Sequence, residues 1–453
     1  MTGNSFRIIP VKAILLVVGD VLLIAASMYL ATYLRLDQFF NPAYFFKALT
    51  VSTGVHIFCF YTLNLYSIAE LRSGRRYWLQ VASAVFLASA FNAVLFYVIP
   101  FWHRGIFILN AAFVFILISL WRAAFRAIIE KTKIKTRVLI IGGGKKGDIL
   151  SDELKKHSGF ELAGLLDGDS MLSDNPMKAD TAVLLKNLVE EERVDRIVIA
   201  GDLPHTAETF AAIVEAKFKG VEIYAMPEMY EELTTMVPVF NLDDIWLSYA
   251  SFYGINNNIY NVRLKHIMDK IISVVILIIS APIAALTAVL IKLDSEGPVF
   301  FTQQRVGFNG HVFKILKFRS MKTDAETDGP QWAGNNDPRV TGIGRIIRKF
   351  RIDELPQLIN VLRGEMSFIG PRPERPDFVH GFNHSIPYYS LRHSVRPGIT
   401  GWAQIKYGYG ASYKDTVIKL QYDLFYIKRL SFMLDVIILF ETVKTVIFGK
   451  GAR

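Results

Sequence analysis

The chain has 453 residues, 52% of them hydrophobic, and its 51 basic and 41 acidic side chains give a formal net charge of +10. This composition excludes a disordered chain and disfavours a purely soluble enzyme, whose apolar share is about 45–50%, while the length is typical of two to three domains. The basic excess suits anionic lipids, nucleotides or nucleic acid, and the single cysteine, Cys59, excludes an intramolecular disulfide framework.

Four apolar runs occupy the N-terminal part of the chain: residues 13–34, 48–66, 79–101 and 105–121. Each has about the 17–25 residues that a helix needs to cross a hydrocarbon core, and none alternates as a membrane barrel strand does. We therefore predict a four-helix transmembrane bundle, domain 1–131. Asp20 is the one acidic side chain in these runs. It marks a polar pathway or, as the alternative, packs against a neighbouring helix.

Basic residues flank the four runs unequally. The larger groups are Arg7 and Lys12, then Arg72, Arg75 and Arg76, and finally Arg122, Arg126, Lys131, Lys133, Lys135 and Arg137. The positive-inside rule then places the N-terminus and everything after residue 122 in the cytoplasm. Residues 1–10 lack the pattern of a cleaved signal peptide, so we expect none.

The next part of the chain predicts an α/β module. Strand-like runs occur at residues 136–141, 162–166, 196–200 and 221–225. Their alternation with helical patterns predicts a parallel, Rossmann-like sheet in a cytoplasmic module, residues 132–250. Gly142, Gly144 and Gly147 match G-x-G-x-x-G after the first run, and Asp167 lies twenty residues further on. Such a turn binds a dinucleotide or simply lets a helix pack on the sheet, and both interpretations stay open.

A fifth apolar run, residues 271–291, is long enough to cross a membrane but contains Pro282. Proline removes a backbone donor and kinks a helix. If the run crossed, residues 305–351, with ten basic and four acidic side chains, would be exported against the positive-inside rule. We therefore predict a helix at 267–292 that enters the membrane, bends at Pro282 and returns to the cytoplasmic face. A kinked spanning helix is the alternative.

The chemistry is expected in a mainly α-helical C-terminal domain, residues 251–453, where Asp353 and Glu354 lie among basic residues. On a helix the two carboxylates point about 100° apart, so one can face a substrate while the other holds a metal or a proton. Nearby cations depress a carboxylate pKa, and an ionised aspartate can attack phosphorus. Further on, a Gly-Pro-Arg-Pro turn restricts the backbone around Arg372, whose guanidinium suits phosphate recognition.

Four segments carry a resemblance to a known family: residues 314–321 (KILKFRSM), 348–361 (RKFRIDELPQLINV), 366–373 (MSFIGPRP) and 395–404 (VRPGITGWAQ). They look like the catalytic domain of bacterial polyprenyl-phosphate hexose-1-phosphate transferases, the monotopic phosphoglycosyl transferases. The resemblance covers residues 260–453, and the preceding helices and Rossmann-like module are similar to the N-terminal half of the family's large members. One departure is Ala281 before Pro282, where family members often have serine.

The resemblance implies that a UDP-sugar donates its sugar 1-phosphate to undecaprenyl phosphate and that UMP is released, the first membrane step of exopolysaccharide, O-antigen or capsule synthesis. Asp353 matches the family nucleophile, which forms a covalent phosphosugar and lies near Mg²⁺, and Glu354 matches its dyad partner. Lys317, Arg348 and Arg372 match positions that hold phosphates.

The same resemblance implies a location in the bacterial inner membrane, with the catalytic domain on its cytoplasmic face. The expected partners are the two substrates and membrane lipid, with a homodimer suggested and no nucleic acid. Glucose and galactose are the sugars that the resemblance favours.

Several other residues have two interpretations. Trp402 lines a nucleotide pocket or anchors a turn, and Arg396 and Gln404 are further candidates for a substrate pocket. Asp423 is more typical of a solvated helix face than of a site. The apolar pattern at residues 432–448 predicts an amphipathic helix that lies on the membrane.

Two other functions share parts of this pattern. A membrane-anchored nucleotide-sugar dehydratase or epimerase also joins membrane helices to a Rossmann domain, but no tyrosine here is followed four residues later by the lysine that its chemistry needs. A non-enzymatic channel or transporter would have membrane helices of matching polarity on both sides of a site, whereas this chain has most of its polar residues in one cytoplasmic block.

Overall fold

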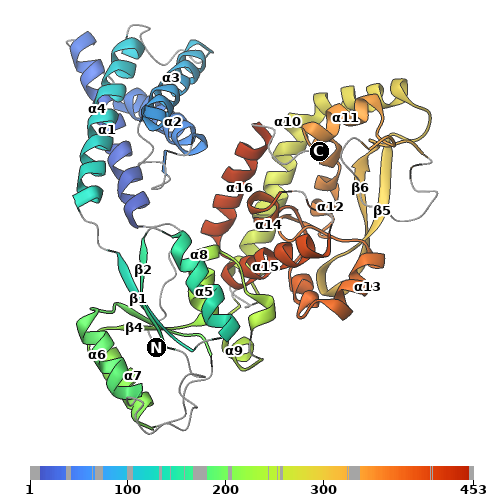
Figure 1. Ribbon diagram of the computed structural model, residues 1–453. Helices are drawn as coiled ribbons and strands as arrows, with labels where there is room; N and C mark the ends of the chain where they lie inside the picture. Colours follow the sequence, from blue (N-terminus) through green and yellow to red (C-terminus); the bar gives the residue numbers. More distant parts are fainter. Residues whose placement is uncertain are drawn as a thin grey trace. The chain divides into compact units, whose positions relative to one another are not determined.

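The structure, a computed structural model, describes residues 11–36, 42–63, 65–66, 75–98, 106–131, 135–142, 144–157, 159–166, 181–201, 207–242, 244–252, 254–255, 259–323, 325, 337–408, 410 and 412–447. The chain forms two compact units, residues 1–134 and 135–453. The first unit is helical, and the second joins an α/β part to a mainly helical C-terminal part (Figure 1).

The first unit consists of the helices α1 (Val11–Leu36), α2 (Pro42–Thr62), α3 (Arg75–Val98) and α4 (Ile106–Lys131). Its core contains Leu16, Ile24, Phe60, Val81, Val114 and Ile118. Among the described residues, α1, α3 and α4 each contain a window that is long and apolar enough to cross a membrane; α2, which includes Lys47 and His56, is a helix outside this group. Exposed apolar side chains such as Leu22, Phe86 and Ile108 suit contact with lipid.

Asp20 has an ionic partner that its local sequence did not indicate. Its Oδ2 accepts a hydrogen bond from Arg122 Nη2 at 2.5 Å, and both side chains are fully buried. Arg122 Nη1 donates to the Leu65 carbonyl at 2.9 Å, and the guanidinium lies 5.2 Å from the centre of the Tyr66 ring. The prediction placed Arg122 beyond the fourth helix, but α4 continues past it. Because a buried charge needs a partner, the pair favours the helix-packing role of Asp20.

The α/β part contains β1 (Thr136–Ile141), α5 (Gly144–Lys156), β2 (Phe160–Leu166), α6 (Thr181–Glu191), β3 (Arg196–Ile199), α7 (Ala207–Phe218), β4 (Glu222–Ala225) and α8 (Met226–Thr234). Neighbouring strands pair in parallel in the order β2-β1-β3-β4. Alternate residues of a strand point to opposite faces of the sheet. Leu139 and Ile197 therefore pack with α6 and α7 on one face. Ile140 and Val198 pack with α5 and α8 on the other face. The predicted parallel sheet is present, and its order is that of flavodoxin-like doubly wound folds.

The glycine motif lies where β1 turns into α5. Gly142 has a φ of +104°, and a Cβ on Gly147 would lie 2.5 Å from the Gly142 carbonyl oxygen, so helix and strand approach too closely for a side chain. Packing therefore accounts for these two glycines. The dinucleotide interpretation stays a prediction, because Asp167 lies outside the described residues.

The remaining elements are η3 (Val239–Asn241), α9 (Asp244–Tyr249), the π-helical turn η4 (Tyr260–Leu264), α10 (Lys265–Asp294), β5 (Phe300–Val306), η5 (Phe308–Gly310), β6 (Val312–Phe318), α11 (Gly342–Lys349), η6 (Ile352–Glu354), α12 (Gln357–Leu362), β7 (Ser367–Ile369), α13 (Pro376–Ser385), η7 (Tyr389–Ser394), β8 (Gly398–Thr400), α14 (Trp402–Lys406), α15 (Tyr413–Arg429) and α16 (Phe432–Ile447). β5 and β6 form an antiparallel hairpin, and β7 pairs with β8 in parallel. The loops and short elements of this part pack around the helices α10, α12 and α15.

Helix α10 runs through Pro282 without interruption and is 30 residues long. It is long and apolar enough to cross a membrane, and ten of its large apolar side chains are exposed, on both sides of the proline. Figure 1 draws its two halves in different directions, and Ala284, Ala288 and Ile291 of the second half pack against α11. A change of direction within the helix is what an internal proline is expected to cause.

Both ends of α10 are bonded to the rest of the C-terminal part. Lys265 Nζ donates to Asp435 Oδ2 of α16 at 2.6 Å, and Asp269 accepts from the Ser367 hydroxyl of β7 at 2.7 Å. At the other end the Arg319 guanidinium donates to backbone carbonyls at and just beyond the end of the helix, including that of residue 295 at 2.7 Å. The apolar helix is thus held directly against elements that carry functional residues.

Helix α16 lies where the amphipathic helix is predicted at residues 432–448. Leu434 and Ile438 are fully buried, and Asp435 pairs with Lys265, so one face of α16 packs inside the protein. Phe432, Met433 and Phe440 remain exposed outside that face, and contact of these side chains with a membrane stays a prediction. The apolar pattern predicted the helix, but tertiary packing determined what covers it.

Candidate active site

The C-terminal part contains a cleft of about 450 Å³ bounded by the β5–β6 hairpin, the segment from α11 to the Gly-Pro-Arg-Pro turn, α14 and α15. Its described basic lining residues are Arg305, Lys317, Arg319, Lys322, Arg339, Arg348, Arg351, Arg372, Arg375, Arg392 and Lys419. Its described acidic lining residues are Asp353, Glu354, Glu374 and Asp423. The cleft is therefore strongly positive, which suits a ligand with several phosphate oxygens.

Asp353 and Glu354 lie in the 3₁₀ turn η6, which follows Arg351 with its φ of +55°. Successive residues of a 3₁₀ turn diverge by about 120°. The two carboxylates consequently meet different neighbours, although both residues are buried, with 8% and 7% of their surface exposed. The sequence predicted this divergence on a longer helix, and the structure provides it in a single tight turn.

Glu354 is the centre of an ion cluster. Its Oε1 accepts a hydrogen bond from Arg372 Nη2 at 2.8 Å and lies 3.4 Å from Lys317 Nζ, while its Oε2 lies 3.7 Å from Arg351 Nη1. Burial by itself raises the pKa of Glu354, but the charges of Arg372 and Lys317 outweigh burial and hold the pKa well below its ordinary value. Glu354 is therefore an anion at neutral pH.

Asp353 has a different environment. Within the described part of the chain its carboxylate makes no hydrogen bond and no ion pair, although it lines the cleft. Burial and the charge of Glu354 raise the pKa of Asp353 to about 6, while Lys317, Arg348 and Arg372 oppose the rise. The expectation that nearby cations depress a carboxylate pKa holds for Glu354 and fails for Asp353, because burial and the charge of Glu354 outweigh the cations around Asp353. Asp353 is the carboxylate available to a ligand.

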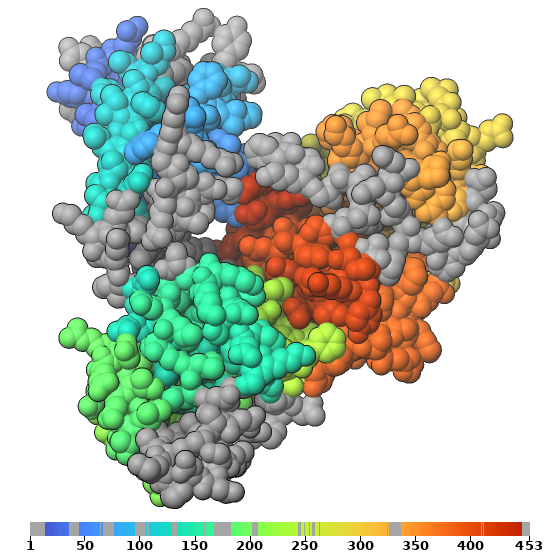
Figure 2. Space-filling view, in the orientation of Figure 1, coloured from blue at the N-terminus to red at the C-terminus, as the bar shows by residue number. Residues whose placement is uncertain are grey.

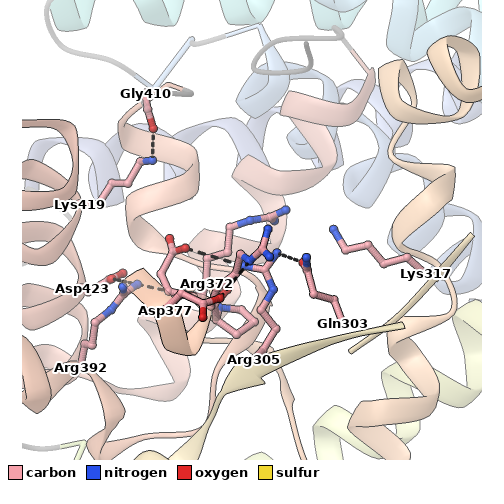
Figure 3. Close-up of polar contacts among 12 residues, drawn as sticks. Gln303, Arg305, Lys317, Arg372, Asp377, Arg392, Gly410, Lys419 and Asp423 are labelled. Carbon is pink, nitrogen blue, oxygen red and sulfur yellow. Dashed lines mark hydrogen bonds and ion pairs between the residues drawn. The ribbon is translucent and has the colours of Figure 1, made fainter. Parts of the chain in front are cut away.

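The Gly-Pro-Arg-Pro turn is held from its backbone side (Figure 3). Arg392 Nη2 donates to the Arg372 carbonyl at 3.0 Å and to Asp423 Oδ2 at 2.8 Å. Arg392 Nη1 donates to the Tyr389 hydroxyl at 2.6 Å. The backbone of Arg372 is thus fixed by one buried ion pair, while its side chain reaches the acidic dyad.

Sequence reasoning missed Arg392 and misjudged Asp423. Asp423 was expected on a solvated helix face, yet it is 2% exposed and pairs with a residue 31 positions away. Burial raises the pKa of Asp423 to about 6, with Arg392 opposing the rise. No local motif marks such a pair, because it forms only when α15 packs against η7.

The three further pocket candidates have separate locations. Gln404 lines the cleft, whereas Trp402 and Arg396 are not among its described lining residues. Trp402 is buried, stacks on Phe425 and donates its indole N–H to the Thr235 carbonyl at 3.3 Å. These contacts fit the anchoring interpretation of Trp402.

Other cations of the cleft are also held in place (Figure 3). Arg305 Nη2 donates to Gln303 Oε1 at 2.7 Å, and Arg305 Nη1 donates to the Pro373 carbonyl at 3.3 Å. On α15, Lys419 donates to the Gly410 carbonyl at 2.6 Å. These hydrogen bonds give two long side chains fixed directions within the cleft.

A magnesium ion fits the donor set of the site. The described residues contain no group of three or more His, Cys, Asp or Glu side chains that could hold a metal. Mg²⁺ does not require one, because it retains several waters and is bound by one or two carboxylates together with substrate phosphates. The unpaired carboxylate of Asp353 meets this requirement.

The sequence is similar to those of known proteins. A family model described as bacterial sugar transferase matches residues 260–449. The chain is 32% identical over 462 residues to the UDP-glucose:undecaprenyl-phosphate glucose-1-phosphate transferase of Klebsiella pneumoniae, covering 96% of this chain and 95% of that protein.

Two further relatives match a smaller share of their own length. The chain is 46% identical over 233 residues to the UDP-N-acetylgalactosamine-undecaprenyl-phosphate N-acetylgalactosaminephosphotransferase of Aeromonas hydrophila, covering 51% of this chain. It is 36% identical over 330 residues to the undecaprenyl-phosphate glucose phosphotransferase of Komagataeibacter xylinus, covering 71% of this chain. The matches span 54% and 60% of the lengths of these two relatives.

Proposed function

The chain belongs to the bacterial sugar transferases, the family of undecaprenyl-phosphate sugar phosphotransferases, and from this premise we propose that it transfers a hexose 1-phosphate from a UDP-sugar to undecaprenyl phosphate and releases UMP. The observation that carries the proposal is the unpaired carboxylate of Asp353 in a cleft lined by cations, beside a Glu354 whose charge is already balanced. A covalent route through an aspartate requires such a nucleophile. The product would begin an exopolysaccharide, O-antigen or capsule.

The reaction consists of two displacements at one phosphorus atom. An Asp353 carboxylate oxygen attacks the phosphorus that bears the sugar, the bond from this phosphorus to the bridging oxygen breaks, and UMP leaves with that oxygen and the electron pair. A phosphate oxygen of undecaprenyl phosphate then attacks the same phosphorus, and Asp353 leaves as a carboxylate. Both nucleophiles are anions, so neither has to lose a proton during attack.

Lys317, Arg348 and Arg372 are the proposed phosphate-binding residues. Phosphoryl transfer depends mainly on positioning and on neutralising charge at the phosphate oxygens. The planar guanidinium groups suit two-point binding of phosphate, and all three cations line the cleft that contains Asp353. Mg²⁺ held by Asp353 and the substrate phosphates would supply further charge neutralisation.

Glu354 is proposed to orient cations instead of donating a proton. Its depressed pKa keeps it ionised, and its Oε1 contacts both Arg372 and Lys317. Cations whose directions are set before the substrate arrives need little reorganisation during the reaction, which is the basis of electrostatic preorganisation.

Helix α10 is proposed to enter the inner membrane from the cytoplasm, bend and return. Its exposed apolar side chains support insertion, and the ten basic residues of the following segment 305–351 oppose export. The cleft would then lie at the cytoplasmic interface, where the phosphate of a polyprenyl lipid is located.

This topology predicts the accessibility of cysteines at the two ends of α10. Lys270→Cys and Glu296→Cys replace exposed side chains, and both are expected to react with a membrane-impermeant maleimide only from the cytoplasmic side. Arg35→Cys at the end of α1 is the matched control and is expected to react only from the periplasmic side. The buried Cys59 is replaced by serine in each case. Periplasmic labelling of Glu296→Cys would make α10 a spanning helix.

The activity is tested with full-length protein in nanodiscs, Mg²⁺, undecaprenyl phosphate and UDP-sugars that include UDP-glucose, UDP-galactose and UDP-N-acetylgalactosamine. We expect steady UMP release with the correct sugar, and one stoichiometric burst of UMP when undecaprenyl phosphate is omitted, because Asp353 then stays occupied. Release of UDP in place of UMP would contradict the proposal, because it places the broken bond at the sugar carbon.

A further inference from the structure

Helix α15 faces the cleft on one side and the α/β part on the other. Lys419 and Asp423 line the cleft. Further along the helix, Lys428 Nζ donates to Glu231 Oε1 of α8 at 2.6 Å, and Arg429 Nη2 donates to the second oxygen of that carboxylate at 3.4 Å. Figure 2 shows the teal and green surface of the α/β part against the orange-red surface of this region.

Other contacts join the same two surfaces. The Val237 N–H, just after α8, donates to the Gln421 carbonyl of α15 at 3.1 Å. The Lys428 ammonium lies 4.1 Å from the centre of the Trp246 ring of α9. The interface therefore combines backbone, ring and charge contacts along the C-terminal half of α15.

The charges of this interface are removed from water. Glu231 is fully buried, and the Lys428 side chain is 8% exposed. Separating such a pair leaves an uncompensated buried charge, so the pair resists relative movement of α8 and α15. The surface pair between Lys186 and Glu215, with side chains 49% and 43% exposed, carries no comparable penalty.

Helix α8 is itself fixed on the parallel sheet. Met226, Met229 and Leu233 pack in the core beneath the strands. At its start, Glu228 accepts a hydrogen bond from the Ala225 N–H at 3.2 Å. The helix that carries Glu231 is therefore held in place by the core of the parallel sheet.

We propose that the α/β part is a brace for α15 and that Glu231 is a positioning residue for donor binding. Glu231 is outside the cleft lining; it acts through Lys428 on the helix that carries Lys419 and Asp423. Asp423 in turn belongs to the network that holds the Gly-Pro-Arg-Pro turn. The brace goes beyond the proposed reaction, and only the kinetic part of its test rests on that reaction.

The kinetic test separates the charge of the Glu231 side chain from its size, in the full-length protein. Glu231→Gln keeps the size of the side chain and removes its charge, and we expect KM for the UDP-sugar to rise about fivefold while kcat changes less than about threefold. If Glu231 only stabilised the fold, the substitution would lower the fraction of folded enzyme, so the apparent kcat would fall and KM would stay unchanged. Glu231→Asp keeps the charge and is expected to recover at least half of the effect. Glu215→Gln, the same change in the exposed pair with Lys186, is the matched control and should equal wild type.

Hydrogen exchange provides a readout that needs no activity. Glu231→Gln is expected to speed amide exchange within residues 413–429 about tenfold, while the strands β1 and β3 keep wild-type rates. Wild-type KM together with wild-type exchange in α15 would overturn the brace. If Glu231→Gln fails to fold, Lys428→Met is the second variant, because it leaves Glu231 paired with Arg429. It is expected to raise KM for the UDP-sugar and to speed amide exchange in α15, each by less than Glu231→Gln would. Wild-type KM together with wild-type exchange in Lys428→Met would also overturn the brace.

Discussion

Asp353→Asn is expected to lower UMP release from the UDP-sugar by at least about 10⁴-fold. Asparagine keeps the shape of the side chain but lacks an anionic oxygen, so the bond from protein to phosphorus cannot form. Intact-protein mass spectrometry after exposure to the donor without acceptor provides a second measurement. Wild type is expected to gain the mass of one sugar phosphate, and Asp353→Asn is expected to gain none.

Asp377→Asn is the matched control for this substitution. Asp377 lies in the first turn of α13, its side chain is 60% exposed, and it is not among the described lining residues of the cleft. It should retain wild-type UMP release and the wild-type mass gain, and thermal unfolding should show that both variants are folded. Substantial turnover by folded Asp353→Asn would reject the nucleophile assignment, and a sugar phosphate found on another peptide of wild type would transfer that role to its residue.

Glu354→Gln should produce the second large effect. The substitution leaves Arg372 and Lys317 without the buried anion that pairs with both. Removing one partner of a buried ion pair costs about 3–5 kcal/mol, so kcat is expected to fall by about 10²–10³-fold if most of that energy is lost in the transition state. Because Asp353 is intact, the sugar phosphate should still accumulate on the protein, only more slowly, as single-turnover UMP release and mass spectrometry would show.

Glu215→Gln is the matched control for Glu354→Gln, because it makes the same change in an exposed ion cluster instead of a buried one. Glu215 also contacts two cations, Lys186 and Lys219, but all three side chains are more than two-fifths exposed, and surface pairs contribute about 0–1 kcal/mol. This variant is therefore expected to keep wild-type kcat and stability. Wild-type kcat in Glu354→Gln as well would show that the cluster around the dyad has no part in ordering the transition state.

The candidate residues of the active site could be proposed from the chain, but their contacts could not. Asp353, Glu354 and Arg372 were predicted together because an acidic pair and a rigid proline turn are local features. Which carboxylate pairs with the cations depends on where separate segments meet, and the folded chain shows that Glu354 contacts Arg372 and Lys317, while Asp353 makes no ion pair with the residues that the structure describes. The resemblance assigned the two residues different roles, but the local sequence did not show which carboxylate pairs with the cations, because the two are neighbours of similar chemistry.

Which face of a helix is buried was the second feature that the sequence did not show. The patterns at α15 and α16 correctly predicted helices, because helical periodicity is expressed within a few turns. They did not show that Asp423 and Asp435 are buried and paired, since an acidic residue on a helix reads as solvated until another element covers it. Trp402 was left open between a pocket and an anchor for the same reason.

The sequence by itself determined the apolar helices, the parallel sheet and the acidic dyad, because hydropathy, periodicity and adjacency are properties of short stretches of chain. Only the tertiary structure decided the partners of the buried charges, which join Asp20 to Arg122 across 102 positions and Glu231 to Lys428 across 197. A charge removed from water requires an opposite charge beside it, and no local pattern reveals which distant residue folding will bring there.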